Sequence, residues 1–126
     1  MPGTLLLVDD EDVVRAYGTR ALTAEGFAVT EAQDGTEALR RVEERGSPFD
    51  LVIADVLMPR MNGAELAEAL LSRNPRQPIL LMSGYPPADL LARNIRTPGL
   101  PLLQKPFTPD ALVDAVRGLL WPRGRH

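Results

Sequence analysis

Residues 4–12 read Thr-Leu-Leu-Leu-Val-Asp-Asp-Glu-Asp, a short apolar run followed directly by four acidic residues. A continuous apolar run of this length is typical of a strand that is buried on both faces, as in a parallel sheet. A helix should follow the acidic residues, because apolar side chains then recur at helical spacing at Val14, Tyr17 and Leu22. The stretch therefore predicts a buried strand joined by a tight turn to a helix.

The same alternation of an apolar run and a helical pattern continues along the chain. Four more strands are predicted, over residues 27–32, 51–54, 79–82 and 100–104. The helices between and after them are predicted to begin at Asp34, at Asn62-Gly63, at Pro87 (a short helix to Asn94) and at Thr108-Pro109. Because parallel strands need crossover connections, the pattern predicts an α/β fold, a doubly wound five-stranded parallel sheet with about five helices.

Composition narrows the classes of protein that remain. The chain has 126 residues, 14 Lys+Arg against 17 Asp+Glu, and no Cys. This length suits a single domain over residues 1–126, with a core of about 4–120 and a short tail over 121–126. The acidic balance disfavours a sequence-independent nucleic-acid binder, and the lack of Cys excludes disulfides, zinc ribbons and thiol catalysis. The sequence has no apolar run near the ~18–20 residues of a membrane span, so we expect a cytoplasmic protein.

Polar side chains follow four of the predicted strands where each strand ends. They are Asp9 and Asp10, Asp55, Ser83 and Lys105. The carboxyl ends of parallel strands share one edge of the sheet, so these side chains should converge there. A carboxylate cluster beside one amine and one hydroxyl is typical of a site for Mg²⁺ and a phosphoryl group. A divalent ion would also remove the repulsion between the three carboxylates.

Each of these residues also has a purely structural interpretation. The acidic run could cap the first helix at the positive end of its dipole, and Asp55 could be a turn residue. Ser83 could belong only to a turn with Gly84, and Lys105 could be solvated. Together these interpretations require four strand ends to carry complementary chemistry by coincidence, so a common site is the favoured interpretation.

Five segments resemble the receiver domain of two-component response regulators, the phosphoacceptor module of bacterial signalling. They are Leu-Leu-Val-Asp-Asp-Glu (6–11), Asp-Leu-Val-Ile-Ala-Asp-Val-Leu-Met-Pro (50–59), Met-Asn-Gly (61–63), Leu-Met-Ser-Gly-Tyr (81–85) and Gln-Lys-Pro-Phe-Thr (104–108). They occur in the family's order at compatible spacing, and the resemblance extends from Leu5 to Leu120. It implies a flavodoxin-like fold of the receiver type.

The resemblance implies a chemical role for three of the strand-end residues. Asp55 would be the nucleophile that takes a phosphoryl group from a phosphohistidine of a histidine kinase or histidine phosphotransfer protein. Ser83 would bond a phosphoryl oxygen once Asp55 is modified, and Lys105 would pair with another. In such domains the peptide bond between Lys105 and Pro106 is cis.

The resemblance also implies a magnesium site as the cofactor site. Asp10 and Asp55 would bind Mg²⁺ directly, together with the backbone carbonyl of Leu57. Asp9 would bind it through water.

Three positions are informative choices within the family pattern. The family usually carries Phe or Tyr three residues before the Lys, where this chain has Leu102. The switch is therefore expected to use Ser83 with a Leu102 that can only repack, although an ordinary strand leucine is the competing interpretation. Leu57 and Tyr85 flank the expected path of attacking water, so their bulk predicts a prolonged phosphorylated lifetime. Residues 82–85 and 103–109 resemble the C-terminal receiver of hybrid sensor histidine kinases.

The resemblance implies a regulatory domain that is not an enzyme and that assists only its own phosphorylation and dephosphorylation. The switched, partner-binding face would combine the helix at 87–94, the strand at 100–104 and the last helix, and a homodimer through this face is a further expectation. The leucines and valine of these helices (Leu90, Leu91, Val113 and Leu119) are expected to face the core more than a partner. A fused kinase or output domain could lie outside this chain, and direct contact with nucleic acid or membrane is not expected.

Two alternative functions stay open at this point. A degenerate receiver would act only as a protein-interaction module, which the intact acidic residues disfavour and Leu102 leaves open. A haloacid-dehalogenase-like Mg²⁺-dependent phosphatase would place its nucleophile after the first strand, with a second Asp two residues later and a cap insertion. Here Asp9 and Asp10 are adjacent and Asp55 lies in the middle of the chain.

Overall fold

The computed structural model describes residues 3–97 and 99–121, and it confirms the predicted alternation of strands and helices. The strands are β1 (Thr4–Val8), β2 (Ala28–Ala32), β3 (Leu51–Asp55), β4 (Ile79–Ser83) and β5 (Leu102–Gln104). The helices are α1 (Asp12–Thr23), α2 (Gly35–Arg45), α3 (Gly63–Arg73), α4 (Pro87–Ala92) and α5 (Pro109–Leu120).

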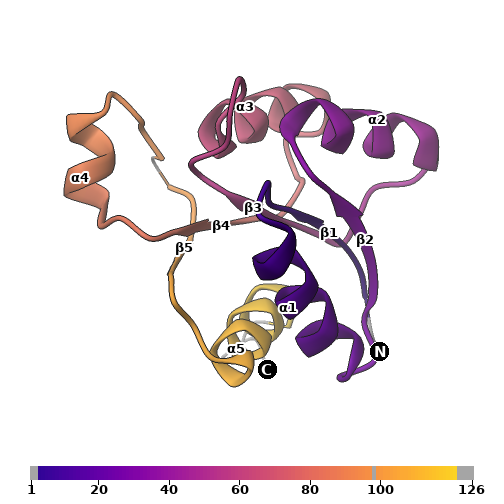
Figure 1. Cartoon of the computed structure of the whole chain (residues 1–126). Helices are drawn as coiled ribbons and strands as arrows, with labels where there is room; N and C mark the ends of the chain where they lie inside the picture. Colours follow the sequence, from indigo (N-terminus) through magenta and orange to yellow (C-terminus); the bar gives the residue numbers. More distant parts are fainter. Residues whose placement is uncertain (1–2, 98, 122–126) are drawn as a thin grey trace.

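The five strands form one parallel sheet in the order β2-β1-β3-β4-β5 (Figure 1). The chain moves from β1 to β2 on one side and then returns past β1 to β3, so the strand order reverses between β1 and β3. In open α/β sheets, ligands bind beyond the carboxyl ends of the strands at such a reversal. A ligand-binding site is therefore expected at the carboxyl ends of β1 and β3.

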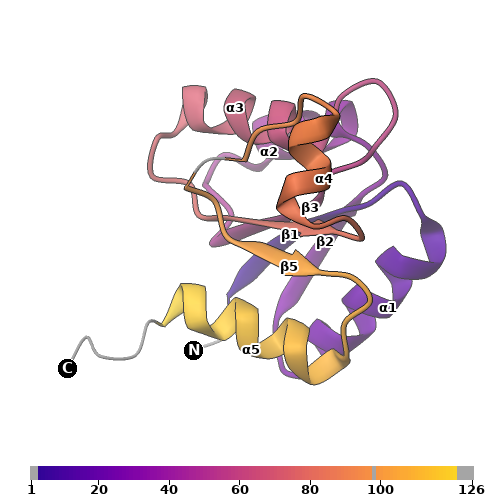
Figure 2. The same cartoon turned by 90° about the vertical axis from the view of Figure 1, so that its left-hand side faces the viewer.

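Helices cover both faces of the sheet, as the apolar runs predict. Figure 1 shows α1 and α5 on one face and α2 and α3 on the other, with α4 near the β5 edge, which Figure 2 turns toward the viewer. Side chains alternate along a strand, so Leu5 and Leu7 pack in the core under α1 and α5, whereas Leu6 and Val8 pack in the core under α2, α3 and α4. All four side chains are at most 1% exposed. This burial on both faces is why the strand reads as a continuous apolar run.

Three of the predicted helix starts carry the expected caps. The side chains of Asp34 and Thr108 accept hydrogen bonds from backbone N–H groups in the first turn of α2 and α5. Asn62 caps α3 in a reciprocal capping box with Glu65. These bonds satisfy donors that a helix end leaves free, and they set where each helix begins after its strand.

The structure corrects several of the sequence expectations. Helix α4 ends at Ala92 and not at Asn94. Strand β5 begins at Leu102 and not at residue 100, because Pro101 has no N–H to donate to the neighbouring strand. Strand β2 begins at Ala28 and not at residue 27. The prediction for Leu91 is wrong: it is 57% exposed, whereas its neighbour Leu90 is 1% exposed. A six-residue helix such as α4 has room for few inward positions, and Leu90 occupies one of them.

The predictions that Val113 and Leu119 of the last helix face the core are confirmed. Val113 is buried, and Leu119 packs partly buried against the same core.

Residues 122–126 of the predicted tail lie outside the described residues, and Trp121 stacks on Phe27 with ring centroids 6.1 Å apart. Among the helices of the described ranges, none has the length and apolar character that crossing a membrane requires.

Candidate functional site

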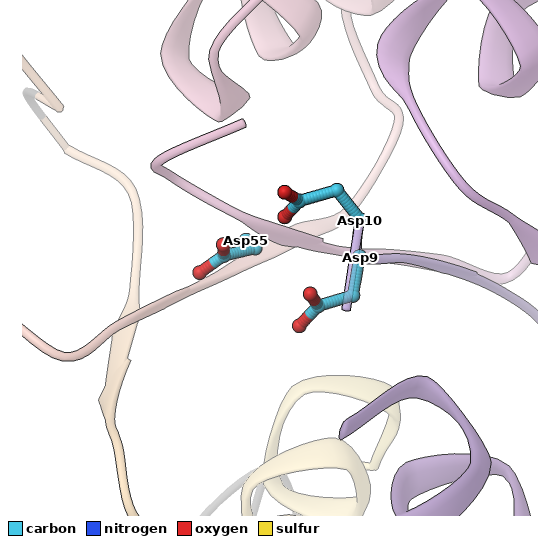
Figure 3. Close-up of side chains that lie close together, drawn as sticks. All are labelled: Asp9, Asp10 and Asp55. Atoms are coloured by element: carbon cyan, nitrogen blue, oxygen red, sulfur yellow. The ribbon is translucent and has the colours of Figure 1, made fainter. Parts of the chain in front are cut away.

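The predicted strand-end residues converge at the carboxyl edge of the sheet. Asp9 and Asp10 follow β1, Asp55 ends β3, Ser83 ends β4 and Lys105 follows β5. The register pairs Asp55 with Met82, which places Ser83 one residue further along the neighbouring strand. Figure 3 shows the three aspartates side by side at the ends of their strands.

The three aspartates form a compact acidic cluster. One carboxylate oxygen from each of Asp9, Asp10 and Asp55 lies within 4.8 Å of the others. Asp9 is fully buried and Asp55 is 6% exposed, whereas Asp10 is exposed to solvent. Closely spaced carboxylate oxygens open to solvent on one side are a donor set that suits Mg²⁺, which prefers oxygen ligands and retains water. The residues present thus fit the predicted magnesium site.

Lys105 supplies the positive charge beside the cluster. Its Nζ lies 2.9 Å from Asp9 Oδ2, 3.1 Å from Asp55 Oδ1 and 3.9 Å from Glu11 Oε1. Burial alone would lower the pKa of Lys105, but its hydrogen bond to Asp9 and the charge of Asp55 outweigh burial and raise the pKa. Lys105 therefore stays charged at neutral pH. The peptide bond between Lys105 and Pro106 is cis, as the resemblance implies.

The pKa of Asp55 is raised from its ordinary 3.8 to about 6. Burial is the largest cause of the rise in pKa, and the nearby charges of Asp9 and Asp10 act in the same direction. Lys105 opposes this rise by its charge and its hydrogen bond. An ionised Asp55 is therefore a desolvated carboxylate that a cation would stabilise.

The Ser83 hydroxyl is held by the loop that follows β4. It accepts a hydrogen bond from Tyr85 N and donates one to Tyr85 O, both at 2.9 Å. The ring of Tyr85 is partly exposed and lies under the guanidinium of Arg93, with Cζ 4.5 Å from the ring centroid. The sequence did not predict that Ser83 is bound to Tyr85. Leu102 is partly buried against the core and pairs in register with Leu81.

Two residues support the site in ways that the sequence did not predict. A Cβ atom built on Gly63 would overlap the carbonyl oxygen of Asp55, so the start of α3 approaches the end of β3 more closely than other residues allow. Arg15 on α1 donates to Asp9 O at 2.6 Å and to the carboxylates of Asp12 and Glu31. The sequence signal for Arg15 was its place three residues after Asp12 on one helix face, but its contact with Asp9 O depends on the tertiary fold.

Beside Lys105 lies an apolar groove of about 450 Å³ between α1 and the loop that follows β5. Its lining includes Val13, Tyr17 and Phe107. Val13 is 82% exposed, and Tyr17 donates a hydrogen bond to Phe107 O at 3.0 Å. Exposed apolar side chains that line a groove beside a polar cluster are typical of a surface that meets another protein.

Comparison with known proteins agrees with this geometry. Residues 5–117 match the family model described as "Response regulator receiver domain". The chain is 42% identical to sensor kinase CckA of Brucella abortus over 93% of this chain and 12% of that protein. It is 34% identical to the probable transcriptional regulatory protein TcrX of Mycobacterium tuberculosis, over 94% of this chain and 50% of that protein. The chain thus spans half or less of these two relatives.

Other similar proteins are nearly the same length as this chain. The response regulator receiver protein CpdR of Brucella abortus is 30% identical over 92% of this chain and 95% of that protein. Among solved structures, chemotaxis protein CheY4 of Vibrio cholerae has a TM-score of 0.83 at 30% identity, over 95% of this chain and all of that chain. The receiver domain of hybrid histidine kinase CckA has a TM-score of 0.79 at 36% identity, over 94% and 99% of the two chains.

These matches confirm both the flavodoxin-like fold and the resemblance to receivers of hybrid kinases. Receiver domains typically bind Mg²⁺ at an acidic cluster, and the cluster of Asp9, Asp10 and Asp55 is such a cluster. The chain belongs to the response regulator receiver domain family of two-component signal transduction.

Proposed function

We propose that residues 1–126 form one phosphoacceptor receiver domain, in which Asp55 takes a phosphoryl group from the phosphohistidine of a histidine kinase or phosphotransfer protein. The observation that carries the proposal is the position of the Asp55 carboxylate, which lies within the acidic cluster and 3.1 Å from the Lys105 amine. In the transfer, a carboxylate oxygen of Asp55 forms a bond to phosphorus while the N–P bond of the donor imidazole breaks. The electron pair of that bond stays on the imidazole nitrogen.

The acidic cluster prepares Asp55 for this reaction. Asp10 and Asp55, with the backbone carbonyl of Leu57, would hold Mg²⁺ directly, and Asp9 would hold it through water. When bound, the ion would supply positive charge against the three carboxylates and the transferred phosphoryl group. Because the pKa of Asp55 is about 6, its carboxylate is mostly ionised at neutral pH and available as a nucleophile.

Lys105 and Ser83 would receive the phosphoryl oxygens. The Lys105 amine already lies beside Asp55 and needs little movement to pair with an oxygen bound there. The Ser83 hydroxyl must first leave its two hydrogen bonds to the Tyr85 backbone. This exchange of partners would pull on the loop between β4 and α4 and let Leu102 repack, which is how a local charge could alter a distant face.

The face that changes would be formed by α4, β5 and α5. Leu91, which is exposed on α4, gives this face an apolar side chain for a partner or for a second copy of the chain. Relatives such as CckA and TcrX are longer than this chain, so a fused kinase or output domain is part of the proposal. Leu57 and Tyr85 would prolong the phosphorylated state by keeping water from the acyl phosphate.

The groove beside Lys105 would receive the phosphodonor protein. Val13 and Tyr17 offer apolar surface next to the site, and a donor seated there would bring its phosphohistidine to Asp55. Docking of this kind is separable from the chemistry, because a small phosphodonor needs no protein surface.

The two alternatives make different predictions. A haloacid-dehalogenase-like phosphatase is disfavoured, since Asp55 ends the third strand and the family match covers residues 5–117. A degenerate receiver would bind partners without being modified, whereas the proposed regulatory function needs modification but no turnover of a separate substrate. We expect acetyl phosphate with Mg²⁺ to add one phosphoryl group to the intact chain by mass spectrometry, and none to Asp55→Asn. An unmodified parent chain would support the degenerate receiver.

A further inference from the structure

Arg15 binds three different parts of the fold at once. Its Nη1 donates to Asp9 O at 2.6 Å, its Nη2 to Asp12 Oδ1 at 2.7 Å and its Nε to Glu31 Oε1 at 2.9 Å. Asp12 belongs to α1, Glu31 to β2, and Asp9 follows β1. The Arg15 side chain is 15% exposed, so most of it is covered by the fold.

The guanidinium geometry makes this arrangement directional. Arginine donors lie in one plane at fixed angles, so binding Asp12 and Glu31 also fixes the direction of the remaining donor. That donor meets the carbonyl of Asp9. Through Arg15, the backbone at Asp9 is therefore connected to both α1 and β2.

The Asp9 carbonyl belongs to the same planar peptide unit as the Asp10 N–H. Fixing the direction of this carbonyl therefore also fixes the orientation of the peptide plane that contains Asp10 N. The Asp9 carboxylate has partners of its own in Glu11 N and Lys105, and Asp55 has Lys105. Within residues 3–97 and 99–121, no hydrogen bond or ion pair holds the exposed Asp10 carboxylate. The direction of this carboxylate is then set by the Asp10 rotamer and by the backbone from which it starts, where Arg15 binds the Asp9 carbonyl.

We infer that Arg15 is a positioning residue for the magnesium site: it orients the peptide between Asp9 and Asp10 so that the Asp10 carboxylate faces Asp55. The inference rests on the proposed function, because it assigns Arg15 to the ion that the acidic cluster would hold. Ligand-orienting groups of this kind typically change metal affinity by about 10–100-fold when removed.

Loss of the Arg15 charge and loss of its positioning role would change the affinity for Mg²⁺ in opposite directions. Arg15 is a cation near an acidic site, so its removal by charge alone would tighten the binding of Mg²⁺. Loss of positioning would weaken binding instead. Arg15→Gln therefore separates the two by the sign of the change, and Arg15→Lys keeps the charge but cannot reproduce three fixed donor directions.

The experiment is calorimetric titration of the full chain with MgCl₂ at pH 7.5, at a temperature where each variant is folded. We expect the Kd for Mg²⁺ to rise about tenfold in Arg15→Gln and by a smaller factor in Arg15→Lys. The matched control is Arg117→Gln, which removes an exposed 2.6 Å ion pair with Glu25 at the other end of α1. It should leave the Kd unchanged.

Unfolding in urea without metal shows whether a variant is merely less stable. A structural role alone would lower the free energy of unfolding and leave the Kd of the folded protein at the parent value. An unchanged or lower Kd in Arg15→Gln, or a parental Kd in Arg15→Lys, would overturn the inference. If Arg15→Gln does not fold, Arg15→Lys decides. A parent chain that binds no Mg²⁺ would instead refute the magnesium site of the proposed function.

Discussion

Replacing Asp55 with Asn is expected to stabilise the metal-free chain near neutral pH, although it removes the proposed phosphoacceptor. In the folded state the ionised Asp55 is buried beside two other carboxylates, and among the described residues only Lys105 supplies a compensating positive charge. Asn has nearly the same shape, keeps an oxygen that can accept from Lys105 and carries no charge. The substitution therefore removes repulsion and desolvation without leaving a cavity.

The pKa of Asp55 sets the size of this effect. Burial, with the charges of Asp9 and Asp10, raises the pKa from an ordinary 3.8 to about 6 against the opposing effect of Lys105. At a pH where the carboxylate is ionised in both the folded and unfolded chain, this difference corresponds to roughly 3 kcal/mol of lost stability. Solvent reaches one side of the cluster at Asp10 and screens part of it, so we expect a gain of about 2 kcal/mol for Asp55→Asn at pH 7.5.

The pH dependence follows from the same values. Well below pH 4 Asp55 is protonated in both states and costs nothing. Between about pH 4 and pH 6 the unfolded chain releases this proton while the folded chain keeps it, so the contribution of Asp55 to stability falls as pH rises. The gain from Asp55→Asn should accordingly drop to roughly a third at pH 4.5.

Urea unfolding in EDTA at pH 7.5 and pH 4.5 measures both quantities. The control is Asp114→Asn, an exposed aspartate on α5 that should change little at either pH. Adding Mg²⁺ should stabilise the parent and not Asp55→Asn, because an ion bound only by the folded state adds its binding free energy to stability. An Asp55→Asn chain that is no more stable than the parent at pH 7.5, or equally stabilised at both pH values, would show that the ionised Asp55 does not destabilise the fold.

Three further predictions concern the neighbourhood of the site. Leu57→Asn should shorten the lifetime of the acyl phosphate several-fold by admitting water, as followed by loss of phosphoryl mass; an unchanged or longer lifetime would contradict this. Gly63→Ala should destabilise the chain by about 2 kcal/mol in urea, because its Cβ would overlap Asp55 O, whereas Gly118→Ala, whose Cβ meets nothing within 4 Å, should stabilise it slightly; equal effects would count against the close approach. Val13→Asp should slow phosphoryl transfer from a phosphohistidine protein by about fivefold while labelling by acetyl phosphate is unchanged, and an equal loss with both donors would argue against docking in the groove.

Much of the fold was predictable because its signals are local. Each buried strand appears in the sequence as a continuous apolar run, and caps such as Asp34 and Thr108 mark where helices begin. The convergence of Asp9, Asp55 and Lys105 followed from topology, since parallel strands place all their carboxyl ends on one edge. Their separations, such as the 2.9 Å contact between Lys105 and Asp9, needed the structure.

The failures concern contacts that local patterns do not encode. A helix as short as α4 gives too few residues to define a period, so Leu91 could not be assigned to solvent. The two bonds between Ser83 and Tyr85 depend on the turn geometry after β4. Arg15 reaches Glu31, sixteen residues away, only because α1 packs beside β2.

Direct identification of the modified side chain tests whether Asp55 is the phosphoacceptor. The chain would be phosphorylated by a phosphohistidine donor with Mg²⁺, reduced with borohydride, which converts an aspartyl phosphate to homoserine, and sequenced by tandem mass spectrometry. We expect homoserine at position 55 and at neither position 9 nor position 10, with no label when Mg²⁺ is chelated. Homoserine at another aspartate, or equal labelling with and without the metal, would contradict it.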